Sequence, residues 1–97
     1  MSSEQTEDRA YLFLDTNICL HYNSFVSIPW AKLVGKPVCL VFCSTVLREL
    51  GRKQVEASQE SLRHRAKKVQ STIEDALLGK QELPQDTTVM HYAKENV

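Results

Sequence analysis

Two acidic residues stand close to points where the chain passes from an apolar run into a predicted helix. Asp15 directly follows the apolar residues 11–14, and Glu49 lies in the helix predicted after the apolar residues 38–43. The carboxyl ends of parallel strands lie at one edge of a sheet, where open α/β proteins bind ligands. If the two strands are neighbours, we expect both carboxylates within a few ångströms of each other. Two anions in a partly dry site are tolerated when a cation lies between them, and Mg²⁺ and Mn²⁺ prefer oxygen ligands. The pattern therefore indicates metal-assisted phosphodiester hydrolysis.

Each carboxylate also has a purely structural interpretation. Asp is common at strand-to-helix junctions, so Asp15 could serve only as a cap for the helix that begins near Ile18. Glu49 could form an ion pair with Arg52 or Lys53 on the same helix. The residues by themselves leave both alternatives open.

The elements that would position the two acids follow from apolar patterning. Residues 11–14 are predicted to form a strand buried on both faces, and residues 38–43 a second buried strand. Helical material and no hairpin turn separate them, so we expect an α/β fold with a parallel sheet. A weaker third strand is predicted over residues 87–92. Helices are predicted over residues 18–22, 30–34, 45 to about 55, and from a cap at Ser58 or Ser61 to about residue 78.

The composition is that of a small globular protein with unevenly placed charge. The 97 residues carry no net charge, but residues 48–68 hold seven basic and three acidic side chains, and residues 69–97 hold two basic and five acidic ones. The basic block can attract a polyanion locally, or it can be solvated helix surface. No apolar run approaches the ~20 residues of a membrane span, and the polar amino terminus does not resemble a signal peptide. We therefore expect a cytoplasmic protein with no membrane partner.

Three motifs resemble those of PIN-domain proteins. Residues 12–17 resemble the opening LDTN strand of that family, residues 46–53 resemble its V-x-x-E-L-x-x-x-K helix, and residues 62–66 are similar to the L-R-x-R-A start of the next helix. The motifs occur in the family's order and cover about residues 11–78. The resemblance implies a three-layer α/β/α fold and a divalent-metal-dependent nuclease, most often a ribonuclease.

The resemblance also implies roles for individual residues. It assigns catalysis and metal binding to Asp15 and Glu49, with Mg²⁺ or Mn²⁺ as cofactor, and a supporting polar role at the site to Thr16 or Asn17. RNA is the implied partner. Basic side chains supply most nonspecific affinity for nucleic acid. The candidate phosphate contacts are Arg48, Arg52 and Lys53.

The chain also departs from the family pattern. PIN domains supply further aspartates from later strands and loops, and neither Asp75 nor Asp86 matches those positions. We therefore expect residues 1–10 to be a flexible leader and residues 11–97 to be the amino-terminal portion of a PIN-like domain, with little or no activity in this truncated form. A second hypothesis is a non-catalytic α/β module that self-associates or binds a partner or inhibitor protein. An incomplete sheet would expose an edge and a face for that purpose.

Overall fold

Three parallel strands form the centre of the molecule. The computed structural model describes residues 8–21 and 25–93. In it β1 (Ala10–Phe13) and β3 (Thr87–Tyr92) both pair in parallel with β2 (Val38–Cys43), so the sheet order is β1-β2-β3. The α/β class, the parallel pairing of the first two strands and the weaker third strand are thus confirmed.

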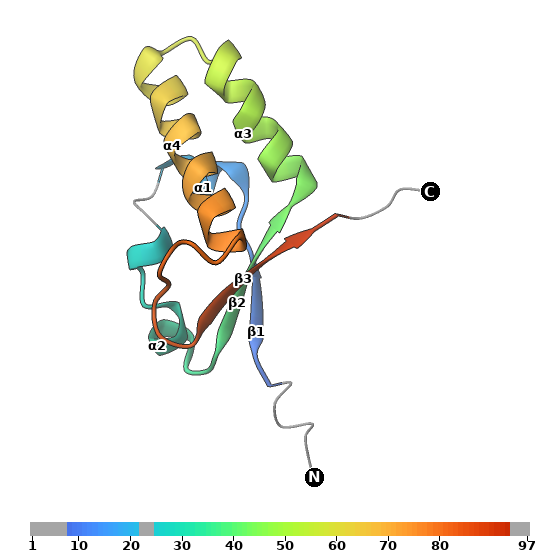
Figure 1. Ribbon diagram of the computed structural model, residues 1–97, viewed down its shortest axis with the longest axis vertical. Coiled ribbons are helices and arrows are strands. Elements are labelled where there is room, and N and C mark those ends of the chain that lie inside the picture. Colours follow the sequence, from blue (N-terminus) through green and yellow to red (C-terminus); the bar gives the residue numbers. More distant parts are fainter. Residues whose placement is uncertain (1–7, 22–24, 94–97) are drawn as a thin grey trace.

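Helices connect the strands. They are α1 (Thr16–His21), the 3₁₀ helix η2 (Phe25–Ser27), α2 (Trp30–Val34), α3 (Ser44–Glu56) and α4 (Glu60–Leu77). The predicted short helix before Gly35 is confirmed, and Gly35 ends it in the left-handed conformation with φ of 91°. Tyr22, the last residue predicted for the first helix, lies outside the described residues. The helices α3 and α4 run side by side beyond the carboxyl end of the sheet (Figure 1). None of the helices in the described ranges has the length and apolar character needed to cross a bilayer.

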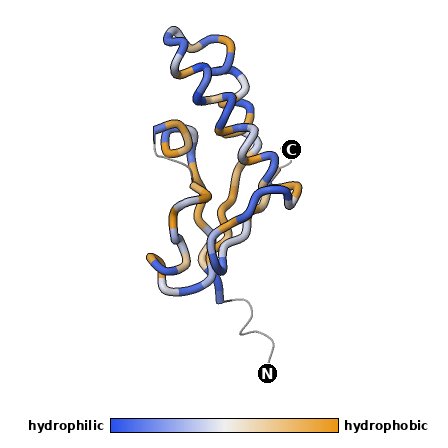
Figure 2. Tube along the Cα trace, turned by 60° about the vertical axis from the view of Figure 1, so that its left-hand side comes forward, coloured by the Kyte–Doolittle hydropathy of each residue, from blue (hydrophilic) through white to orange (hydrophobic). Residues whose placement is uncertain are grey.

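The hydrophobic core lies between the helices and one face of the sheet. Leu40 and Phe42 of β2 are fully buried, as are Leu50 of α3 and Ile73 of α4. Burying a side chain of this size stabilises the fold by about 1.5–3 kcal/mol. Figure 2 shows hydrophobic residues along the strands and a mostly hydrophilic α3–α4 pair. The apolar side of each long helix, which includes Leu50 or Ile73, therefore packs into this core.

The opposite face of the sheet differs from the sequence prediction. Tyr11 is 51% exposed and Phe13 is 60% exposed, so the prediction that the first strand is buried on both faces is wrong. Val41, in the central strand, is nevertheless buried. It lies between the outer strands, whose Phe13 and Tyr92 rings meet edge to face with centroids 6.3 Å apart. Of the three predicted layers, the described residues supply the sheet and one helical layer.

The first strand begins at the last residue of the predicted leader. Ala10, predicted to end a flexible leader, is the first residue of β1, and its N–H donates to the Pro37 carbonyl at 2.9 Å. Asp8 forms an exposed ion pair with Lys36 at 3.2 Å, which contributes little to stability. Residues 1–7 of the predicted leader lie outside the described part of the chain.

Candidate functional site

The residues that follow β1 and β2 meet at the carboxyl edge of the sheet. The hydroxyl of Thr16, the first residue of α1, donates to Oε1 of Glu49 on α3 at 2.6 Å. Thr16 is buried and Glu49 is partly buried. A hydrogen bond to a charged acceptor is shorter and stronger than a neutral one. The hydrogen bond from Thr16 therefore holds the Glu49 carboxylate against the start of α1. Thr16 directly follows Asp15 in the chain.

Asp15 caps α1. Its Oδ1 accepts a hydrogen bond from the Ile18 N–H at 2.9 Å, which satisfies one of the free donors in the first helical turn. The predicted cap is thus confirmed, for a helix that begins at Thr16 and not near Ile18. The side chain is exposed, and the cap occupies one of the two carboxylate oxygens. Because an ionised carboxylate has about four acceptor positions, capping leaves Asp15 able to ligate a cation.

A thiol lies on the same short helix as these residues. Burial raises the pKa of Cys19 to about 11, and the negative charge of Asp15 adds to this effect. The thiol is therefore protonated at neutral pH, and it is the thiolate that ligates metals. The donors left at this end of α1 are oxygens, which suits a hard cation more than zinc or copper.

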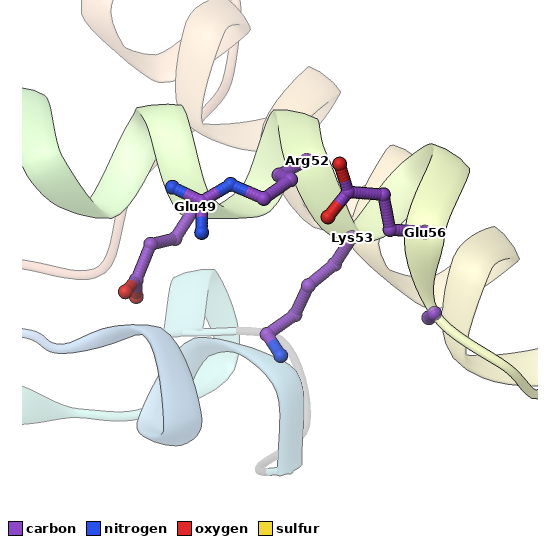
Figure 3. Close-up of a pocket in the computed structure, with 5 residues that line it drawn as sticks. Glu49, Arg52, Lys53 and Glu56 are labelled. Carbon is purple, nitrogen blue, oxygen red and sulfur yellow. The ribbon is translucent and has the colours of Figure 1, made fainter.

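The predicted ion pair between Glu49 and a neighbouring base is not found in the structure. In the described ranges, salt bridges join Lys36 to Asp8 and His64 to Glu60, but none involves Glu49. A cleft of about 220 Å³ instead opens along α3. Its lining consists of Glu49, Arg52, Lys53, Glu56 and Ala57. In Figure 3 the Glu49 and Lys53 side chains extend from α3 toward the segment of β1 and α1, drawn in pale blue. The cleft thus contains two carboxylates and two cationic side chains.

Two of the predicted site residues lie outside this arrangement. Arg48 is exposed on α3 but does not line the cleft. Asn17 is exposed on α1, and within the described chain its side chain makes no hydrogen bond. The structure therefore brings Glu49 together with Thr16, Arg52 and Lys53, and it leaves these two side chains at the periphery.

A second polar pair at the same edge was missed by the sequence analysis. Ser44 Oγ and His91 Nε2 lie 2.8 Å apart. Ser44 directly follows β2, and His91 lies beside Phe42 near the end of β3. The signal was present in the sequence, because both residues lie at the ends of predicted strands, and parallel strands end at one edge.

The candidate cation ligands at this edge are the carboxylate oxygens of Asp15 and Glu49. The described residues contain no group of three or more His, Cys, Asp and Glu side chains that could enclose a metal. Mg²⁺ commonly keeps several waters and binds through one or two carboxylates and substrate phosphates. Asp15 and Glu49 each have one oxygen engaged in the hydrogen bond described above, so the second oxygen of each carboxylate is the candidate ligand.

Comparison of the chain with models of protein families, with curated proteins and with solved structures gives no match. The interpretation of this site therefore depends on its own geometry and on the sequence motifs.

Proposed function

We propose that the protein is a divalent-metal-dependent ribonuclease of the PIN type, in which Asp15 and Glu49 bind Mg²⁺ or Mn²⁺. The single observation that supports this most is the 2.6 Å hydrogen bond from Thr16 to Glu49. It joins the helix after β2 to the residue next to Asp15, at the edge where parallel sheets bind ligands. A bound divalent cation supplies an activated water and neutralises charge on the phosphate.

The residues around the two acids have distinct roles in this proposal. Thr16 orients the Glu49 carboxylate, and the helical cap orients Asp15. Arg52 and Lys53 line the same cleft as Glu49, so they are placed to bind the phosphates of an RNA strand. Arg48, which is exposed on α3 outside the cleft, contacts the RNA strand beyond the cleft. Asn17 adds a polar group at the start of α1.

Two carboxylates leave most of the metal's coordination shell to water and substrate. We therefore expect weak metal binding and slow turnover. The further aspartates of the PIN pattern, which have no counterpart in the matched motifs, would add ligands. The three cysteines are free thiols, which favours the reducing cytoplasm as the compartment.

Metal binding tests the proposal directly. The electron paramagnetic resonance signal of free Mn²⁺ should fall as the 97-residue chain is added, and Asp15→Asn and Glu49→Gln should each weaken binding by about tenfold or more. Asn caps a helix as well as Asp does, so Asp15→Asn preserves the start of α1. Glu56→Gln is the matched control, because Glu56 lines the same cleft but is not a proposed ligand.

RNA cleavage in Mn²⁺ provides the second readout. We expect the unaltered chain to cleave single-stranded RNA slowly and Asp15→Asn to cleave it at least tenfold more slowly still. Equal cleavage rates, or equal Mn²⁺ affinity in the two proteins, would exclude Asp15 from the mechanism.

A second candidate function, self-association or binding of a partner or inhibitor protein, is favoured by the sheet face opposite the helices. Tyr11, Phe13, Met90 and Tyr92 are all exposed on it. A contiguous apolar patch of this kind is typical of interaction surfaces. Sedimentation of the unaltered chain and of Phe13→Lys tests self-association. A monomer at all concentrations, with no binding of a hydrophobic dye, would contradict this candidate.

A further inference from the structure

A second, larger cavity lies beside α4, and its lining includes Ile18, the residue whose N–H donates to Asp15. It has a volume of about 680 Å³. Ligand pockets for small molecules have volumes of about 300–1,000 Å³. Its apolar wall includes Ile18 of α1, Trp30 and Leu33 of α2, and Val69 of α4. The cavity shares no lining residue with the cleft that holds Glu49, Arg52 and Lys53. We call it the α4 groove.

The wall of the α4 groove exposes more apolar surface than a closed core would. Leu33 is 70% exposed and Ile18 is 37% exposed. The polar atom of the Trp30 ring is already satisfied, because its Nε1–H donates to the Phe25 carbonyl at 2.8 Å. The wall therefore offers hydrocarbon and the indole ring for apolar contact, and the Trp30 N–H needs no hydrogen bond from an occupant.

The charged side chains of the α4 groove are all positive. Arg65 and Lys68 line it, and no acidic residue does. One guanidinium nitrogen of Arg65 donates to the Leu20 carbonyl at 2.9 Å, which fixes the group in place and leaves its other N–H donors available. Within the described chain, Lys68 has no ion-pair partner. The charge is thus complementary to an anion.

We propose that the α4 groove binds an amphipathic carboxylate, a single unbranched hydrocarbon chain that ends in one negative charge. The hydrocarbon lies along Trp30, Leu33 and Val69, and the carboxylate accepts hydrogen bonds from Arg65 and Lys68. Burial of the exposed Leu33 side chain adds to the affinity, because apolar area removed from water stabilises the complex. The assay of this binding requires neither metal nor RNA.

The fluorescence of Trp30, the single tryptophan of the chain, reports occupancy of the α4 groove. The probes are decanoate, 1-decanol and decyltrimethylammonium, all below their micellar or solubility limits. We expect a saturable 1:1 change with decanoate, about tenfold weaker binding of 1-decanol, and still weaker binding of the cation. Charge-assisted contacts at a partly exposed rim account for a difference of this size.

Variants of α4 separate a specific site from nonspecific uptake. Arg65→Gln and Lys68→Gln should each weaken decanoate binding by about threefold to tenfold and leave 1-decanol binding unchanged. Lys67→Gln is the control, since Lys67 is an exposed neighbour that does not line the groove. Leu33→Asp should weaken both ligands, and its high exposure means that the fold tolerates it.

Three results would overturn the proposal. One is a Trp30 signal that does not saturate with decanoate, and another is equal affinity for all three probes. The third is saturation by an acidic amphipathic peptide together with no response to decanoate, which would assign the groove to a protein partner. Mn²⁺ binding does not enter any of these readouts, so the outcome is separate from that of the nuclease proposal.

Discussion

Removing the Thr16 hydroxyl should destabilise the fold. Thr16→Val keeps the shape of the side chain but takes away the donor that lies 2.6 Å from Glu49 Oε1. A hydrogen bond to a charged group contributes about 1.5–3 kcal/mol, and a neutral one about 0.5–1.5 kcal/mol. Glu49 is only partly buried, so water replaces part of the lost interaction. We therefore expect Thr16→Val to lower the free energy of unfolding by about 1–2 kcal/mol.

Urea denaturation followed by circular dichroism measures this loss. A small domain unfolds with a slope of about 1 kcal/mol per molar urea, so the midpoint should fall by about 1–2 M. Thr45→Val is the matched control, because Thr45 is exposed on α3. That control should stay within about 0.5 kcal/mol of the unaltered chain.

A double-mutant cycle assigns the loss to the pair itself. Thr16→Val and Glu49→Ala should be non-additive by about 1 kcal/mol, because either change alone already breaks the contact. Additive effects would refute the reasoning. So would a Thr16→Val loss no larger than that of Thr45→Val, since either result would show that the hydrogen bond does not join α1 to α3 in solution.

Three further predictions concern the core, the buried thiol and the cleft along α3. Leu50→Ala removes a fully buried side chain, so it should cost about 2–5 kcal/mol and lower the melting temperature by about 4–8 °C per kcal/mol in a thermal scan. Because the folded pKa of Cys19 is about 11 against an ordinary 9.0, the stability associated with the protonated thiol is fully present below pH 9 and is lost as the pH rises to about 11. Denaturation series at pH 8, 9, 10 and 11 should therefore show a free energy of unfolding that falls more steeply with pH for the unaltered chain than for Cys19→Ala, by up to about 1.4 kcal/mol per pH unit. Parallel curves would contradict the burial of the thiol. Arg52→Gln should reduce the salt dependence of single-stranded RNA binding by about 0.7 in the log–log slope, whereas Lys80→Gln, outside the cleft, should leave the slope unchanged.

The sequence by itself determined the local elements. The continuous apolar run of β2 and the 3.6-residue periodicity of α4 predict a strand and an amphipathic helix, because both depend on neighbours only a few residues away. The absence of a hairpin between the first two strands predicted their parallel pairing. The position of Asp15 at a strand-to-helix junction was likewise readable, as was its alternative role as a cap.

The sequence could not decide which side chains meet across the fold. Thr16 and Glu49 are 33 residues apart, and Ser44 and His91 are 47 residues apart. Strand ends predict which residues lie at one edge of the sheet. Which of them pair follows from the register of the parallel strands and the packing of the helices, which no local pattern encodes. The position of Glu49 in the helix after the second strand predicted a ligand or an ion-pair partner of a neighbouring base, but only the packed structure selected Thr16 as its hydrogen-bond donor.

Exposure of the sheet was also decided by tertiary structure. An apolar strand is buried only where another layer covers it, and its residue types do not say whether that layer is present. Phe13 is 60% exposed because the described helices cover the other face of the sheet, whereas Leu40 on that face is fully buried. The same docking of α1, α2 and α4 forms the apolar groove around Trp30, whose lining comes from segments far apart in the chain. Local chemistry thus determined the elements, and packing determined which of their side chains form sites.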